Sequence, residues 1–354
     1  MKSYLYLLLT LLSAGVILLL VFHFGDIPNR YKNGFKRKYF PGACVAVRKI
    51  DCKDTLHEII GTTPWNIYIT TATEGEVLQL SRGPDNTVRR IKIPFFTRFY
   101  DSLGLGSLSI KIDSPYIYLF AENKPAIIKT SFDSGSFEVR VLPPGPFTRE
   151  AMAGADCFIL RKFDPRITDQ VFVRYTFSTG SLKKEDGISQ VYGDGGIITD
   201  GQLHFDPETK KLYYIYFYKN LLLAFDTALT ITNRFFSIDT VGSFKIRTAM
   251  VRNEGTAAFT NVTPAHVINK ANDVRQGLLF NMSALKADNE SDKFFSDNSI
   301  LDVVDLKTGV YRGSIYLPVL NGSKLSRFIA SDSSVIGLYT NSVVFYDLRP
   351  GLHR

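Results

Sequence analysis

The chain has 354 residues, of which 45% are hydrophobic and 21% are charged. This composition excludes a disordered chain or a low-complexity fibre, because neither buries enough apolar surface to offset the entropy of ordering. The 27 Phe and 18 Tyr favour β-structure, where aromatic side chains pack well. The net charge of +8 is spread along the chain and forms no basic stripe, so no nucleic-acid partner is expected.

Residues 4–24 form an apolar segment of 21 residues without a fixed charge. At about 1.5 Å per residue, a helix of this length spans roughly 30 Å, the thickness of a bilayer core. A cleavable signal peptide is the alternative, but its apolar core is shorter and ends at small residues, unlike Phe22 to Asp26. We therefore predict that residues 1–26 are an N-terminal transmembrane helix that anchors the protein in a membrane.

The side of the membrane is a separate question. Basic residues after the span, such as Arg30 and Lys32, would hold the main domain in the cytoplasm under the positive-inside rule. Large domains can nevertheless be translocated regardless of such charges. Our interpretation favours a single-pass membrane protein with its main domain on the extracytoplasmic, periplasmic side.

Beyond residue 30, short runs of β-branched and aromatic residues alternate with turn residues. Four segments share an alternating strand pattern that ends in proline: 34–41, 87–94, 137–144 and 311–318. The spacing is 53 residues from Pro41 to Pro94 and 49 residues from Pro94 to Pro143. Proline suits the end of an outermost strand, because it donates no hydrogen bond to a sheet. A period near 49 residues with about four strands per unit is typical of propeller blades.

On these features, residues 31–348 resemble a β-propeller of the broad TolB-like or NHL-like six-bladed class. Five units end near residues 94, 143, 193, 242 and 318, and residues 283–299 form a polar loop inserted in the fifth. The C-terminal unit, 324–348, lacks an outer strand, whereas 34–41 has the outer-strand pattern but no inner strands before it. We therefore predict an all-β fold in which residues 27–354 form one six-bladed β-propeller. Its ring is closed by pairing of strand 34–41 with the C-terminal blade 324–348.

The sequence contains no compact catalytic or metal-binding motif. The five histidines match no metal spacing, and we expect no cofactor and no metal. Asp194, Asp200 and Asp206 lie among glycines and could offer oxygen ligands to Ca²⁺, but ordinary turns explain them better. Cys44 and Cys52 are either bridged, if their Cα atoms lie within about 7 Å, or buried free thiols.

The resemblance to a propeller implies where a ligand would bind. The loops from each outer strand to the next inner strand, and those between second and third strands, share one face of the ring. Charged and aromatic residues of these loops are the candidate ligand-binding residues: Arg98, Tyr100, Arg149, Arg161, Arg166, Asp194 and Asp200. Arginine and aromatic side chains suit anionic or carbohydrate-like groups.

The sequence names no reaction. The absence of a catalytic constellation favours a membrane-tethered binding or scaffold module in a bacterial envelope over an enzyme. Its partners would be the membrane, through the N-terminal helix, and a protein or glycan on the channel face. The alternative is a propeller hydrolase or lyase that acts on a glycan or peptide at that face, because such sites are assembled from residues on different blades.

Overall fold

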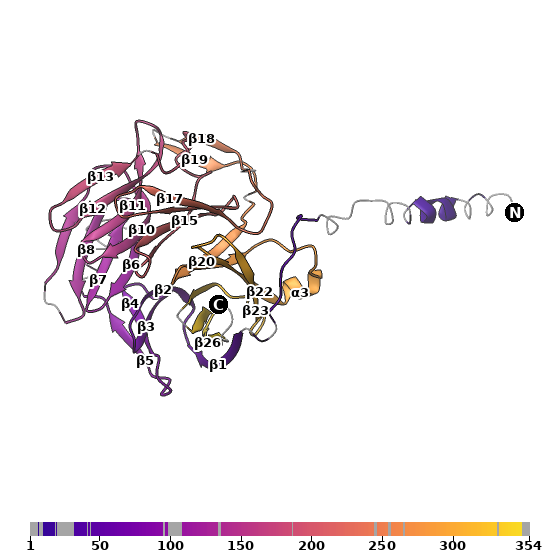
Figure 1. The fold of residues 1–354 in the computed structure, drawn as a ribbon, viewed down its shortest axis with the longest axis horizontal. Helices are drawn as coiled ribbons and strands as arrows, with labels where there is room; N and C mark the ends of the chain where they lie inside the picture. The colour runs from indigo at the N-terminus through magenta and orange to yellow at the C-terminus, as the bar shows by residue number, and fades with distance from the viewer. Residues whose placement is uncertain are drawn as a thin grey trace.

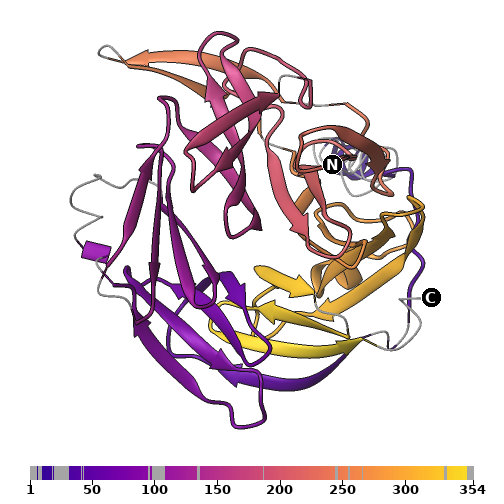
Figure 2. The ribbon, with the colours of Figure 1, turned by 60° about the vertical axis from the view of Figure 1, so that its left-hand side comes forward.

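The computed structural model describes residues 6, 10–17, 19, 32–40, 42, 44–94, 96–97, 108–133, 136–185, 187–243, 246–253, 256–264, 266–330 and 333–348. Within these residues, six four-stranded antiparallel sheets follow one another around a ring (Figures 1 and 2). The arrangement is a six-bladed β-propeller, as the sequence predicts. A further two-stranded hairpin, β18 (Thr248–Asn253) and β19 (Thr256–Asn261), projects from the rim of the ring (Figure 2).

Blades 1 to 5 are simple meanders whose first strand is innermost, and blade 6 takes its outer strand from the N-terminal part of the chain. Blade 1 contains β2 (Leu56–Thr62), β3 (Asn66–Thr71), β4 (Glu76–Ser81) and β5 (Val88–Lys92). Blade 2 contains β6 (Leu108–Asp113), β7 (Tyr116–Ala121), β8 (Ala126–Ser131) and β9 (Glu138–Val141). Blade 3 contains β10 (Phe147–Gly154), β11 (Cys157–Asp164), β12 (Asp169–Thr176) and β13 (Ser181–Glu185).

The second half of the ring repeats this order. Blade 4 contains β14 (Gly201–Asp206), β15 (Lys211–Tyr216), β16 (Leu221–Phe225) and β17 (Ile231–Phe236). Blade 5 contains β20 (Asn269–Arg275), β21 (Leu278–Ser283), β22 (Asn298–Asp305) and β23 (Tyr311–Pro318). Blade 6 contains β24 (Arg327–Ala330), β25 (Ser334–Leu338), β26 (Ser342–Leu348) and β1 (Cys44–Asp51).

The ring is closed by a different segment from the one that the sequence predicts. The outer strand of blade 6 is β1, which pairs antiparallel with β26 from Cys44 opposite Leu348 to Asp51 opposite Ser342. The predicted closing strand, 34–41, does not pair with the C-terminal blade over its described residues. The prediction mistook the proline-terminated pattern for the outer strand, whereas β1 has the length and the hydrogen-bonding groups to cover β26. An N-terminal strand therefore closes the ring, as predicted, but this strand begins about ten residues later in the sequence than the predicted one.

Residues 33–40, called here the N-terminal strap, lie against blade 5 instead. Tyr39 forms a parallel bridge with Ser314 of β23, and the Ser314 amide donates to the Lys38 carbonyl at 2.8 Å. Gly313 lies beneath this crossing, and a Cβ there would overlap the ring of Phe40. The strap therefore passes close to a backbone position that only glycine can occupy.

The strap is held by the insertion between β21 and β22, where a short helix, α3 (Asp292–Ser296), replaces part of the loop expected there. The Asn33 amide donates to Asp288 at 2.7 Å, and the Asn289 side chain donates to the Arg37 carbonyl at 2.9 Å. The Arg37 guanidinium is buried and donates to Asp302 at 2.8 and 3.1 Å and to Glu290 at 2.8 Å. We call Arg37, Asp302 and Glu290 the strap clamp.

Apolar side chains fill each interface between neighbouring blades. Between blades 3 and 4, Phe172 contacts Tyr214 and Phe225 with ring centroids 5.0 and 5.2 Å apart. Between blades 2 and 3, Phe158 contacts Phe120 at 5.7 Å. Aromatic pairs of this geometry stabilise a core beyond their buried area. The aromatic excess of the sequence therefore lies mainly where blades pack together.

The N-terminal segment is described only at residues 6, 10–17 and 19, where the backbone is helical and lies apart from the ring (Figure 1). Within the described part of the chain, no helix is both long enough and apolar enough to cross a membrane. Most of the predicted span, 4–24, falls outside the described residues.

The three cysteines are free. Cys44 begins β1 and Cys52 directly follows its end, so a strand rise of about 3.3 Å per residue separates them by roughly 26 Å. This separation rules out a disulfide between Cys44 and Cys52. Of the two alternatives, the free thiols are therefore correct.

Candidate functional site

The centre of the ring contains a cavity of about 830 Å³. Residues of all six innermost strands, β2, β6, β10, β14, β20 and β24, line it. Consecutive residues of these strands reach the cavity, for example Glu58 to Ile60 of β2 and Gln202 to Phe205 of β14. This volume falls within the range of sites for small ligands, and polar groups from several blades converge there.

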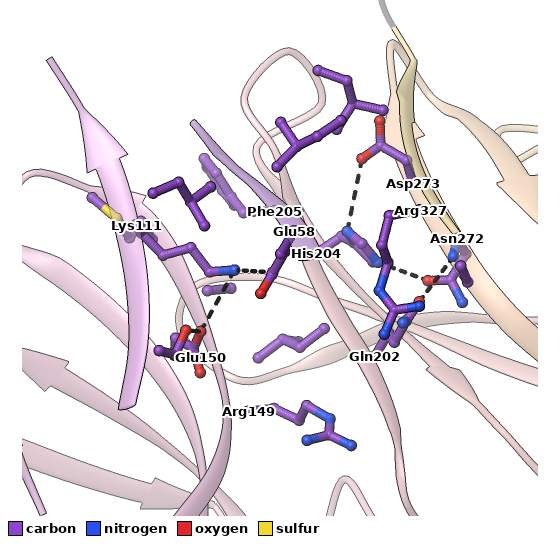
Figure 3. A pocket seen from close by; sticks show the side chains of 18 of the residues that line it. Glu58, Lys111, Arg149, Glu150, Gln202, His204, Phe205, Asn272, Asp273 and Arg327 are labelled. Atoms are coloured by element: carbon purple, nitrogen blue, oxygen red, sulfur yellow. Dashed lines mark hydrogen bonds and ion pairs between the residues drawn. The ribbon is translucent and has the colours of Figure 1, made fainter. Parts of the chain in front are cut away.

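One wall of the cavity carries an ion-pair cluster from blades 1 to 3 (Figure 3). The Lys111 ammonium lies 2.8 Å from Glu58 Oε1 and 3.7 Å from Glu150 Oε1, and the Ser109 hydroxyl donates to Glu150 at 2.5 Å. Burial opposes the charge of Lys111, but the two carboxylates more than offset it and the pKa of Lys111 is raised. Burial also raises the pKa of Glu150, although Lys111 and Ser109 oppose this shift.

The opposing wall, from blades 4 and 5, carries His204, Asn272 and Asp273, called here the histidine wall (Figure 3). His204 Nε2 lies 2.7 Å from Asn272 Oδ1, and His204 Nδ1 lies 3.9 Å from Asp273 Oδ1. Because an amide oxygen only accepts hydrogen bonds, Nε2 carries the hydrogen. Burial lowers the pKa of His204 to about 4, so the imidazole is neutral at physiological pH.

Two further bonds fix the histidine wall. The second oxygen of Asp273, Oδ2, accepts from the Ala330 amide of β24 at 2.6 Å, and the Asn272 amide donates to Gln202 Oε1 at 2.8 Å. Burial raises the pKa of Asp273 to about 6. The side chains of His204 and Asp273 remain 22% and 19% exposed, and both line the cavity.

The two walls act on each other across the cavity. The charge of Lys111 lowers the pKa of His204, and the charge of Glu58 raises it, as smaller contributions beside burial and the bond to Asn272. A charged group within several ångströms can shift a pKa in this way. The two clusters therefore belong to one site.

Three of the residues predicted from the sequence come together at one side of the cavity. Arg149 lines it, donates to Asp200 at 2.7 Å and to the Gly201 carbonyl at 2.5 Å, and lies over the ring of Phe217. Arg161 lies 3.5 Å from the same Asp200 carboxylate but is only 1% exposed. Arg161 joins blade 3 to the loop before β14 by donating to the Gly196 carbonyl at 2.7 Å.

The other predicted residues lie elsewhere. Asp194 is buried and accepts from the amides of Gly196 and Ile198, so it shapes the loop to which Arg161 binds. Arg166 pairs with Asp164 at 2.8 Å and does not line the cavity. Arg98 and Tyr100 lie outside the described residues.

Sequence reasoning missed the residues that the cavity brings together: Glu58, Lys111, His204, Asn272 and Asp273. Their common feature is a position within the repeat. Lys111, Glu150, His204 and Asn272 are each the fourth residue of an innermost strand, and Glu58 is the third. A polar residue recurring at or next to the fourth position of the innermost strands of blades 1 to 5 is the signal that aligned repeat units would have given.

Comparisons with known proteins support the fold alone. No protein-family model matches the sequence, and no curated protein matches it. Among solved structures, a member of the DUF4221 family from Bacteroides vulgatus is 13% identical with a TM-score of 0.52, and the match covers 86% of this chain and 97% of that one. A catalytically inactive virginiamycin B lyase from Staphylococcus aureus with quinupristin is 8% identical with a TM-score of 0.49, covering 85% and 99%. The DUF4221 structure supports the overall fold and nothing beyond it.

Proposed function

We propose that the protein is a membrane-tethered binding module of a bacterial envelope and that the central cavity is its ligand site. The observation that carries the proposal is the convergence of Lys111, Glu58, His204 and Asn272 from four different blades on one cavity. Polar side chains with only a structural role do not need to meet at one cavity from several blades, because water molecules can satisfy their hydrogen bonds. The ligand would be a polar glycan or peptide, because the lining mixes charged groups with the rings of Phe205, Phe217 and Phe328.

A thermal-shift screen of soluble oligosaccharides and short peptides tests the site. Ligands that raise the melting temperature of the wild-type protein are tested again on Lys111→Met, which removes the cation at the centre of the ion-pair cluster. The matched control is Arg140→Met, which removes a cation paired with Glu138 on the outer strand β9. We expect the shift to disappear in Lys111→Met and to persist in Arg140→Met. Equal shifts in both variants, or no ligand in either chemical class, would contradict the proposal.

The tether is tested separately. The apolar segment 4–24 supports membrane attachment, and periplasmic exposure follows from our interpretation of its orientation. We expect the full-length protein to sediment with membranes and a chain lacking residues 1–26 to stay in the supernatant. Protease added to spheroplasts should digest the propeller, and protection until the membrane is lysed would place the domain on the cytoplasmic side.

A second candidate is an enzyme that uses the same cavity. His204 favours it, because a neutral imidazole with a free lone pair can act as a general base. Mass spectrometry of a bound ligand after prolonged incubation separates the two functions. An unchanged ligand supports a binding module, whereas a cleaved ligand whose turnover is lost in His204→Phe supports a hydrolase or lyase.

A further inference from the structure

The histidine wall presents hydrogen-bonding groups that the protein itself leaves without partners. Asn272 is 6% exposed and lines the cavity, yet its Nδ2 has no acceptor among the described residues. A buried donor without a partner is costly, and native proteins rarely retain one without a reason. The Nδ2 atom itself is covered, so a ligand atom with a lone pair would reach it after a small shift of the Asn272 side chain toward the cavity.

Two acceptors accompany this donor. His204 Nε2 carries the ring hydrogen, because it donates to Asn272 Oδ1. The other ring nitrogen, Nδ1, then has a lone pair, and it lies 3.9 Å from Asp273 Oδ1, which is also an acceptor. Two acceptors cannot bond to each other. At this separation, a single donor atom that carries two hydrogens can lie about 2.8 Å from each of the two acceptors and bond to both.

The charge of the cavity favours a positively charged donor. The lining carries five acidic side chains, Glu58, Asp113, Glu122, Glu150 and Asp273, against four basic ones, Lys111, Arg149, Arg275 and Arg327. Of the basic ones, Lys111 is already paired with two carboxylates, and Arg149 is paired with Asp200, which does not line the cavity. Counted over the whole lining, the cavity therefore carries a net negative charge, although Arg275 and Arg327 lie on the same side as Asp273.

We propose that the histidine wall binds a primary ammonium group that has an oxygen acceptor next to it. The ammonium donates to His204 Nδ1 and Asp273 Oδ1, and the neighbouring oxygen accepts from Asn272 Nδ2 once that side chain shifts toward the cavity. The amino terminus of a peptide has this chemistry, with its own carbonyl as the acceptor, and so does an amino sugar with its adjacent hydroxyl. This inference rests on the proposed function, since it names the group that the cavity would recognise.

Binding is expected to depend on pH through Asp273. The groups that face this carboxylate are His204 and Asp206 of β14, the Val274 amide and Arg275 on its own strand, the Ala330 amide of β24 and, in the same lining, Arg327. The pKa of Asp273 is raised to about 6, so the carboxylate is mostly ionised at pH 7 and mostly protonated at pH 5. His204 remains neutral over this interval because its pKa is about 4. Affinity for the ammonium should therefore fall about tenfold from pH 7 to pH 5.

Saturation-transfer NMR with the full-length protein tests the proposal with two pairs of probes. Trialanine is compared with N-acetyl-trialanine, and glucosamine with N-acetylglucosamine, at pH 7. We expect the free amine of at least one pair to bind at least tenfold more tightly than its acetylated partner, and the pair that responds identifies the source of the amine. Equal binding within both pairs, or no binding of either amine, would overturn amine recognition.

Two variants assign the effect to the histidine wall. Asp273→Asn keeps an oxygen to accept from the Ala330 amide but removes the charge, and His204→Phe keeps a ring but removes the acceptor. Each should weaken binding of the amine at least tenfold, whereas Arg140→Met on β9 should not change it. If both variants bind the amine as the wild type does, the inference is wrong. Probes that bind in the cavity equally with and without the acetyl group would overturn this inference and leave the proposed function standing.

Discussion

The strap clamp and the histidine wall are both clusters of polar side chains that join segments far apart in the sequence, but they are completed differently. In the clamp, Arg37 donates three bonds to two carboxylates, and Glu290 also accepts from the Tyr316 hydroxyl at 2.6 Å. In the histidine wall, the side-chain Nδ2 of Asn272 has no acceptor, and two acceptors lie beside each other. Unpaired buried atoms such as Arg161 Nε also occur away from the cavity, so an open group indicates a ligand site only where its residue lines the cavity. Four predictions test this comparison.

We expect the largest loss of stability from opening the ring. Replacing residues 44–51 with a Gly/Ser segment of equal length removes β1 and exposes the edge of β26. A domain of this kind is stabilised by only about 5–15 kcal/mol, so loss of a whole strand should abolish cooperative unfolding. Circular dichroism is the suitable measurement, because the single tryptophan, Trp65, is 77% exposed and reports poorly on the core. A sharp transition at the wild-type temperature would show that the ring does not depend on β1.

Breaking the strap clamp should be the next largest effect. Arg37→Met leaves Asp302 and Glu290 buried without their cation, and burial already raises the pKa of Asp302. Removing one partner of a buried ion pair costs about 3–5 kcal/mol. Lys36→Met is the matched control, because Lys36 is the exposed neighbour on the same strap and should change stability by less than about 0.5 kcal/mol. Denaturant unfolding measures both, and similar midpoints would refute a structural clamp.

Breaking the ion-pair cluster of the cavity should lower the stability of the fold by an intermediate amount. Lys111→Met leaves Glu150 without its cation and should cost about 1–3 kcal/mol at neutral pH. Burial raises the pKa of Glu150 above its unfolded value, so the charged form is the one that disfavours folding. The loss in Lys111→Met should therefore be smallest at acidic pH and should grow as the pH rises through the raised pKa of Glu150. A loss that does not change with pH would exclude this explanation.

The smallest effect should come from the histidine wall. The folded-state pKa of Asp273 is about 6, above its unfolded value, so its charge opposes folding at neutral pH and not at acidic pH. Asp273→Asn should therefore leave stability unchanged at pH 4 and raise it at pH 8, by on the order of 1 kcal/mol. Chemical denaturation at the two pH values measures this. A loss of more than about 2 kcal/mol at pH 8 would place Asp273 with the structural clusters and break the comparison.

Much of the fold could be predicted because it depends on local patterns. The outer strands end at Lys92, Val141 and Pro318, within two residues of the units predicted from the sequence. The C-terminal unit predicted at 324–348 coincides with β24, β25 and β26, which lack an outer strand of their own. Strand period, turn residues and the spacing of prolines are properties of short segments, and five of the six blades are meanders of neighbours in sequence.

The closing strand and the candidate site could not be predicted in the same way. Residues 34–40 and β1 both have strand-like patterns, and only their contacts with β23 and β26 separate a strap from a closing strand. The predicted arginines were chosen from loops, so Arg149 was found but the inward-facing Lys111 and His204 were not. A polar residue in a strand becomes informative only when the axis of the ring is known.

The sequence by itself determined the class of fold, the number of blades and the order of most strands, because hydrophobic alternation and turn chemistry act over a few residues. Only the tertiary structure decided which N-terminal segment closes the ring, where Arg37 finds its two carboxylates, and which side chains meet at the axis. These contacts join residues up to hundreds of positions apart. Their partners are selected by burial and charge in three dimensions, which no local pattern records.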